Sequence, residues 1–73
     1  MYYLVNVQHL SDGQTASSIL NYETKELAMS AYHNTLLYNY SANDVIRFMV
    51  SVLDDSMPVS WESYAKDDNT IDE

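Results

Sequence analysis

The chain has 73 residues and a formal net charge of -8 at pH 7, because 11 acidic residues are balanced by only 3 basic ones. A chain of this length forms one small domain and has no room for separate cofactor-binding and substrate domains. Hydrophobic residues make up 47% of it, which is too many for a wholly disordered protein. The negative charge argues against direct binding to nucleic-acid backbone or anionic lipid.

Several protein classes are excluded by what the sequence lacks. It contains no cysteine, so disulfides, thiolate zinc sites and a cysteine nucleophile are absent and the hydrophobic core must supply the stability. No apolar run approaches the roughly 20 residues that span a bilayer. The first residues lack the basic and long apolar segments of a signal peptide. We therefore expect no membrane association and a cytoplasmic location.

The first predicted elements are two strands joined by a tight turn. Residues 2–10 alternate in the manner of a strand and are rich in aromatic and β-branched side chains. Asp12-Gly13 follows, and an Asp-Gly pair between apolar runs is a strong hairpin signal because glycine adopts positive φ. Residues 15–22 are then the return strand. Its apolar positions change face between Ile19 and Leu20, which predicts a bulge or an early end.

A helix is predicted from Lys25 to about Tyr40. Thr24 is a suitable N-cap, and Glu26 suits the positive end of the helix dipole. A helical spacing of about 100° per residue gathers one set of side chains on the inner side. This inner set is Ala28, Ala31, Tyr32, Thr35 and Asn39, flanked by Leu27, Leu36 and Tyr38.

The second half of the chain predicts two more strands and a tail. Val45 to Leu53 alternates clearly, and we expect the helix to face one of its sides, formed by Ile46, Phe48, Val50 and Val52. Asp54 to Pro58 is expected to be a turn, and Val59 to Tyr64 a short fourth strand. Residues 66–73 are acidic and nearly devoid of apolar side chains, so we expect a single domain over 1–65 and a disordered tail over 66–73.

This order, ββαββ, predicts an α+β fold. The helix returns the chain so that the third strand lies antiparallel beside the first, and the second turn adds the fourth strand. The result is a four-stranded antiparallel sheet in the order 2-1-3-4, with one helix packed on one face. The two most apolar strands then lie at its centre.

No catalytic, cofactor or metal site is predicted. His9 and His33 are the only histidines, and their spacing is not that of metal ligands. No serine has the sequence context of a nucleophile, no calcium-loop pattern surrounds the paired acids, and the single glycine excludes a phosphate-binding loop. The charge also has the wrong sign for stacking nucleic-acid bases on the aromatic side chains. We expect a protein that is not an enzyme and needs neither cofactor nor metal.

We predict an interaction surface on the side of the sheet that the helix leaves uncovered. The first and third strands are apolar on both sides, and monomers seldom expose large contiguous apolar patches. A two-fold homodimer would bury this face; alternatively, the segment around Trp61 and Tyr64 folds back over it. The outer side of the helix has almost no charge, so Leu37 is either a further contact or an isolated exposed leucine. The predicted surface residues are Tyr2, Leu4, Val45, Met49, Leu53 and Leu37, with Arg47 as the main charge on the uncovered side.

The stretches Tyr3–Gln8, Asp12-Gly13, Ala31–Thr35 and Val50–Asp54 together resemble a group of small uncharacterised proteins of phages and prophages of Gram-positive bacteria. The similarity covers most of residues 2–62, and only the combination of stretches is specific. The resemblance implies an accessory or virion-associated phage protein. It carries over no activity and no catalytic or binding residue.

Two hypotheses from different functional classes follow. The first is a non-enzymatic interaction module that self-associates or docks an unidentified protein. The second is an acidic decoy whose carboxylates stand in for phosphates and occupy the nucleic-acid-binding groove of a host or defence protein. Binding of this kind weakens steeply with salt. A flexible acidic tail presents no fixed array of charges, so we favour the interaction module.

Overall fold

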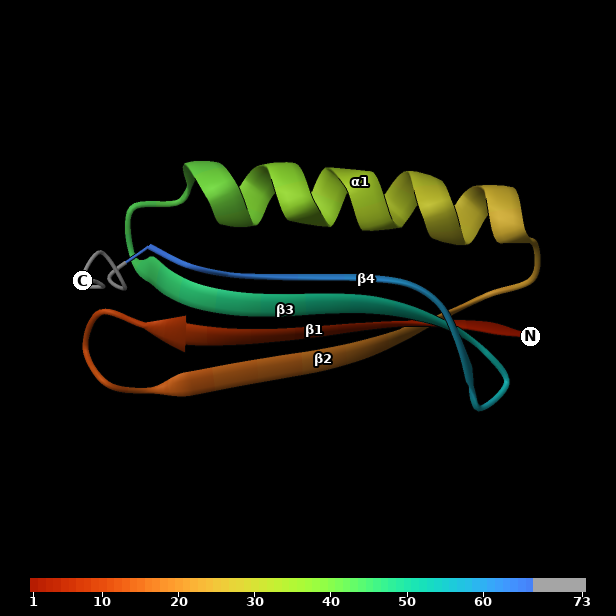
Figure 1. Ribbon diagram of the computed structural model, residues 1–73, viewed down its shortest axis with the longest axis horizontal. Helices are drawn as coiled ribbons and strands as arrows, with labels where there is room; N and C mark the ends of the chain where they lie inside the picture. Colours follow the sequence, from red (N-terminus) through yellow and green to blue (C-terminus); the bar gives the residue numbers. More distant parts are fainter. Residues whose placement is uncertain (67–73) are drawn as a thin grey trace, which may run out of the picture.

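The structure, a computed structural model, describes residues 1–66. Its elements are β1 (Tyr2–Leu10), β2 (Thr15–Tyr22), α1 (Lys25–Ser41), β3 (Val45–Asp54) and β4 (Met57–Ala65). The strands form one antiparallel sheet in the order β2-β1-β3-β4, and α1 lies across one face of it (Figure 1). The predicted ββαββ order, the α+β fold and the strand order are confirmed.

The turn between β1 and β2 is the predicted Asp-Gly hairpin. Gly13 adopts a φ of 91°, and its N–H donates to the Leu10 carbonyl at 3.0 Å. The Gln14 N–H donates to Asp12 Oδ1 at 2.9 Å, so the aspartate side chain braces the turn. β2 then pairs with β1 in one continuous register from Thr15 to Tyr22. The bulge or early end predicted between Ile19 and Leu20 is therefore wrong: the strand continues to Tyr22, it is exposed on both sides, and burial imposes no pattern on it.

Helix α1 is capped at both ends by its own sequence. Thr24 Oγ1 accepts the Leu27 N–H at 3.2 Å, which confirms the predicted N-cap. At the other end, the Ala42 N–H donates to the Tyr38 carbonyl at 2.9 Å, and the Ser41 hydroxyl donates to the Leu37 carbonyl at 2.8 Å. These bonds satisfy polar groups that a helix end leaves open.

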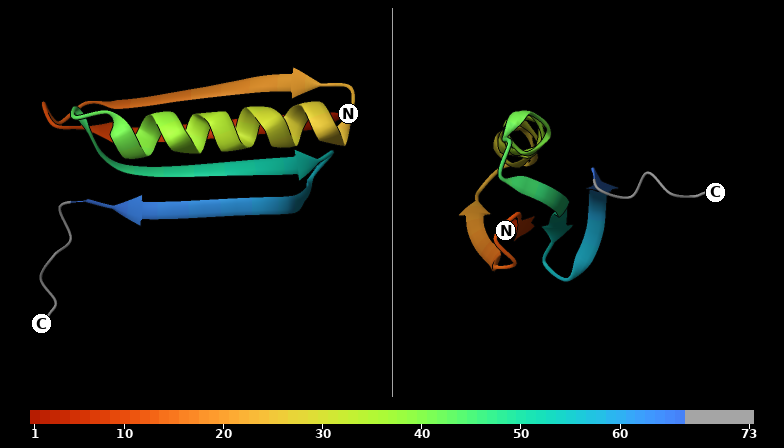
Figure 2. Two further views of the ribbon diagram at one scale, coloured as in Figure 1. Left: turned by 90° about the horizontal axis from the view of Figure 1, so that it is seen from above. Right: turned by 90° about the vertical axis from the view of Figure 1, so that its left-hand side faces the viewer.

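The core lies between α1 and the two central strands. Figure 2 shows the helix above the middle of the sheet, with β2 and β4 as the outer strands. From the helix, Ala28, Tyr32 and Leu36 are buried, and from β3, Phe48, Val50 and Val52. The predicted contact between Phe48, Val50, Val52 and the inner side of the helix is confirmed, although Leu36 contributes more than a flanking residue would.

The predicted orientation of β1 is wrong. Leu4 is directly opposite Val52 in the sheet, and opposing residues of an antiparallel pair point to the same side. Leu4 is therefore buried under the helix, with 3% of its surface exposed, and Tyr2 packs against the same core. β1 is apolar on both sides, so its own alternation does not determine which side faces the helix.

The start of β3 also differs from the prediction. The register between β1 and β3 shifts between His9 and Leu10, so that Leu10 pairs with Val45 and Ile46 is the additional residue. An additional residue reverses the alternation of side chains. Val45 is consequently in the core with 1% exposure, while Ile46 is only partly buried and lies outside the core cluster. The core position assigned to Ile46 is thus occupied by Val45.

One polar side chain lies within this apolar layer. Asn39 of the helix is fully buried. Its Oδ1 accepts a hydrogen bond from Gln8 Nε2 at 2.6 Å, and its Nδ2 donates to Asn6 Oδ1 at 3.0 Å. Both partners lie on the side of β1 that faces the helix. The amide therefore has protein partners for its donor and its acceptor, as burial requires.

The last strand is longer than predicted, and its end is anchored. Asp55, with a φ of 57°, and Ser56 form the turn, and Pro58 lies within β4. Beyond the strand, the Lys66 N–H donates to the Ile46 carbonyl and its Nζ donates to the Ala42 carbonyl, both at 2.7 Å. Lys66 thus belongs to the folded domain and not to the predicted tail, of which the remainder, 67–73, lies outside the described residues.

Candidate interaction surface

The side of the sheet away from α1, here called the open face, has no element packed on it among residues 1–66 (Figures 1 and 2). The strand registers assign its members row by row, because opposing residues share a side. It is formed by Thr15, Ser17, Ile19 and Asn21 of β2, Tyr3, Val5, Val7 and His9 of β1, Arg47, Met49, Ser51 and Leu53 of β3, and Trp61, Ser63 and Ala65 of β4.

The open face exposes a band of apolar side chains. Ile19, Val5, Ser51 and Trp61 form one row across the strands. The outer members of this row, Ile19 and Trp61, are each 64% exposed, and Met49 in the next row is 43% exposed. Large exposed side chains gathered on one face of a sheet are typical of a binding site.

Carboxylates are absent from the open face within residues 1–66. Glu62 in β4 faces the helix side together with its cross-strand partner Val50. The other carboxylates of residues 1–66 lie at the two ends of the sheet, in turns, in loops, in the first turn of the helix or, for Asp54, at the last position of β3. They are Asp12, Glu23, Glu26, Asp44, Asp54 and Asp55. The open face instead carries Arg47 and His9. The protein has a net charge of -8, so a second acidic protein meets the least electrostatic repulsion on this face.

The predicted surface residues do not form one patch. Met49 and Leu53 lie on the open face, as predicted. The placement of Tyr2, Leu4 and Val45 there is wrong for the two reasons given above, the orientation of β1 and the additional residue Ile46. Leu37 is 68% exposed but belongs to the helix, and hence to the opposite side of the molecule.

The alternative covering of the face by the C-terminal segment is also wrong. Trp61 and Tyr64 belong to β4, which continues the sheet beside β3 and does not fold back across it. Trp61 is instead among the most exposed apolar side chains of the open face. The alternating pattern of β1 could have indicated Tyr3, Val5 and Val7 as open-face residues, had the register with β3 been known.

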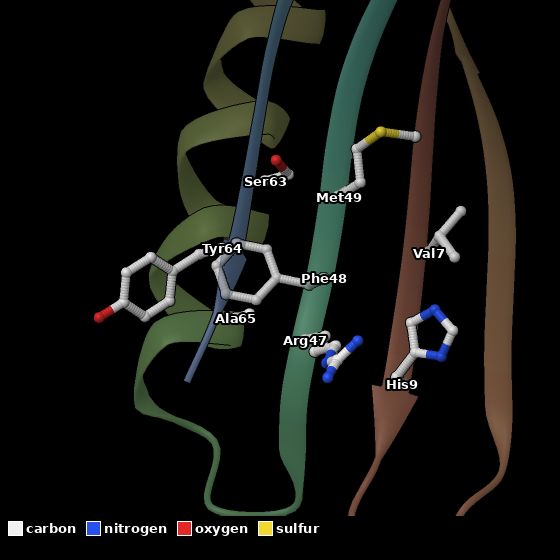
Figure 3. Close-up of a pocket in the computed structure, with 8 residues that line it drawn as sticks. All are labelled: Val7, His9, Arg47, Phe48, Met49, Ser63, Tyr64 and Ala65. Carbon is white, nitrogen blue, oxygen red and sulfur yellow. The ribbon is translucent and has the colours of Figure 1, made fainter. Parts of the chain in front are cut away.

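A shallow groove of about 670 Å³ lies at the end of the open face where β3 and β4 finish pairing. Figure 3 shows its lining, with the helix behind the sheet. Val7, His9, Arg47, Met49, Ser63 and Ala65 belong to the open face. The other two lining residues, Phe48 and Tyr64, belong to the helix side, where both rings pack on Tyr40 with centroid distances of 4.9 and 5.3 Å. The groove is thus mainly a depression in the open face, extended at its edge by Phe48 and Tyr64.

Tyr40 has a strongly raised pKa. Its hydroxyl donates a short hydrogen bond to Glu62 Oε2. That bond, followed by partial desolvation and the negative charge of Glu62, raises the pKa of Tyr40 from 10.0 to about 12. This pair lies on the helix side, away from the open face, and ties the end of α1 to β4.

The two histidines lie on different elements, His9 on β1 and His33 on α1. His9 Nδ1 is 3.4 Å from Thr15 Oγ1, and both side chains are exposed. His33 is on the helix, with its ring edge-on to Tyr32 at 5.3 Å. Within residues 1–66, no group of three or more histidine, aspartate or glutamate side chains is placed to hold a metal ion. Over the same residues, α1 is neither long nor apolar enough to cross a bilayer.

Comparisons of the chain with protein-family models, with curated proteins and with solved structures find no significant match. The resemblance to small phage and prophage proteins therefore stays a prediction.

Proposed function

We propose that this protein is a non-enzymatic interaction module that forms a homodimer by packing two open faces against each other. The observation that carries the proposal is the combination of exposed Ile19, Met49 and Trp61 with a face free of carboxylates in the described chain. A second copy supplies a matching apolar surface and adds no acidic charge to the contact. In this proposal the module is an accessory protein of a phage or prophage and works in the cytoplasm or on a virion.

The size of the face suits such a dimer. The sheet has four strands, and strands about 26 Å long at a spacing of about 4.8 Å make a face of roughly 500 Å². Two faces together bury about 1,000 Å², the lower limit for a specific interface. Stacked sheets pack about 10 Å apart, which leaves room for the side chains of both faces to interdigitate.

The acidic decoy receives less support from the structure. A decoy needs carboxylates in a row that matches a phosphate backbone. Those of residues 1–66 are instead divided between opposite ends of the sheet: Asp12 and Asp44 lie at one end, and Glu23 and Asp55 at the other. We therefore favour the interaction module.

The test is the mass of the protein in solution, measured by sedimentation velocity, with Met49→Glu as the disrupting variant. A glutamate on the open face has to be buried unpaired in the dimer, so we expect Met49→Glu to lower the assembled mass. The matched control is Leu37→Glu, which places the same charge on the exposed side of the helix and should leave the mass unchanged. Equal masses for wild type and Met49→Glu, or a loss of mass with Leu37→Glu only, contradict the proposal.

Trp61 provides an independent readout, since it is the one tryptophan of the chain. Its side chain is 64% exposed in the monomer and would be buried in the dimer. Dilution of wild type should therefore shift its fluorescence emission to longer wavelength. Met49→Glu should show the long-wavelength emission at all concentrations.

A further inference from the structure

The two edge strands of the sheet differ in how they are protected. β4 carries Pro58, the charged Glu62 and a register shift opposite Val52 and Leu53, all of which hinder the addition of another strand. β2 has none of these. Its sequence, TASSILNY, contains no charged residue and no proline, and its pairing with β1 is regular throughout. A regular, exposed edge of this kind is a template for pairing with another chain.

The backbone groups that β2 presents to solvent can be identified. The Leu10 N–H donates to the Gln14 carbonyl at 2.8 Å, so Leu10 and Gln14 form a hydrogen-bonded pair. Such pairs alternate along an antiparallel ladder, so the even-numbered residues of β2 point their N–H and C=O groups at β1. The odd-numbered ones direct theirs outward, away from the sheet. They are Thr15, Ser17, Ile19 and Asn21.

We infer that β2 is a second interaction site, at which it pairs antiparallel with β2 of another copy about a two-fold axis at Ser18. This register opposes Thr15 to Asn21 and Ser17 to Ile19 of the second copy. It uses every outward N–H and C=O of the strand and keeps each side chain on its own side of the joined sheet. The two helices then lie on the same side of a continuous sheet.

The chemistry of β2 favours a second copy as the occupant. Copies of this chain carry a net charge of -8 each, so they meet most easily where neither has a charge. The stretch from Gly13 to Tyr22 is uncharged, and every one of its residues up to Asn21 is exposed. When two copies of β2 pair in this register, hydroxyl, amide and aliphatic side chains lie opposite each other, and no like charges meet across the axis.

The edge contact is independent of the open-face dimer. One stacks two sheets, and the other extends a sheet sideways. Each contact is isologous, and a protomer that has both joins dimers into larger assemblies. Wild type should then exceed the mass of a dimer at high micromolar concentration, while loss of either contact leaves a dimer.

The test uses Met49→Glu as the background, because it removes the open-face contact and leaves β2 unaltered. Adding Ser17→Pro removes an outward N–H without breaking the ladder to β1, and proline is tolerated on an edge strand. We expect Met49→Glu to sediment as a dimer and the Ser17→Pro double variant as a monomer. Ser17→Ala is the matched control: it changes the same side chain, retains the N–H and should remain a dimer.

A second variant reports on the register and covers the case in which Ser17→Pro perturbs the fold. Ser18→Lys in the same background places two ammonium groups opposite each other at the axis. It should be monomeric at low salt and dimeric at high salt, where the repulsion is screened. If Met49→Glu alone is monomeric, or if Ser18→Lys leaves the mass unchanged, the edge contact is refuted. If Ser17→Pro alone is monomeric while Met49→Glu alone has the wild-type mass, the open-face proposal fails and the edge contact stands.

Discussion

The two faces of the sheet consist of the same strands and differ in what covers them. On the helix side, Val50 and Val52 are completely buried and Phe48 is 3% exposed. On the open face, their immediate neighbours on β3 are Met49, which is 43% exposed, and the partly buried Ser51 and Leu53. Apolar composition alone therefore does not produce a core, and the position of the single helix decides which half of the apolar side chains stabilises the monomer.

The largest difference in stability between the two faces should be seen on truncating adjacent residues of β3, one on each face. Phe48→Ala removes a buried ring that packs on Tyr40 at a centroid distance of 4.9 Å, and should cost about 3–5 kcal/mol of the free energy of unfolding. Met49→Ala, one residue along, should cost about 1 kcal/mol or less in the monomer because Met49 is 43% exposed and lies outside the core cluster. Urea denaturation followed by circular dichroism at low protein concentration measures both. Similar midpoints for the two variants would show that the assignment of the faces is wrong.

An intermediate loss of stability is expected on removing the buried amide of Asn39 on the helix side. Asn39→Ala leaves the amides of Gln8 and Asn6 without their partner, and should cost about 1–3 kcal/mol. Asn34→Ala is the matched control, since Asn34 is exposed on the outer side of the same helix and alanine favours the helix. The same denaturation experiment applies. An Asn39→Ala variant as stable as Asn34→Ala contradicts a structural role for the hydrogen-bonded amides.

The smallest effect on stability is expected from the hydrogen-bonded pair of Tyr40 and Glu62 on the helix side. Because the pKa of Tyr40 is raised to about 12 in the folded protein, the folded state holds this proton more tightly than the unfolded chain. Its contribution to stability is therefore complete below pH 10 and lost as the pH rises toward 12. Glu62→Gln removes the acceptor charge and should lower the pKa of Tyr40, as measured by ultraviolet titration of tyrosinate.

Tyr40→Phe identifies the phenol in that titration, because the highest-titrating tyrosine should disappear in this variant. A Glu62→Gln protein whose tyrosinate titration equals that of wild type would mean that the hydrogen bond is not the cause of the shift.

The fold could be predicted because its local signals agree with each other. The Asp12-Gly13 turn, the Thr24 cap and the alternation of Phe48, Val50 and Val52 each specify one element, and the element order leaves few ways to connect them. The orientation of β1 could not be predicted in the same way. Its two sides are similarly apolar, and only pairing of Leu4 with Val52 of β3 places one of them under the helix.

The candidate surface was harder to predict than the fold for a related reason. The additional residue Ile46 reverses the alternation at the start of β3, and nothing in the local sequence marks it, so Val45 was assigned to the wrong side. Trp61 became an open-face residue only through the register of β4 with β3. Surface membership depends on register, which is a property of pairs of strands and not of any one segment.

The buried amide of Asn39 has a consequence for the alignment of the two layers. Apolar contacts between a helix and a sheet are non-directional, so a helix could slide by one turn, about 5.4 Å, and still bury valine and leucine side chains. The hydrogen bonds from Asn39 to Asn6 and Gln8 exist at one setting only. Any other setting would break both hydrogen bonds and leave the fully buried amide of Asn39 unpaired. This small polar cluster thus makes one relative position of helix and sheet lower in energy than its neighbours, and so gives a largely uncharged helix a single docked position.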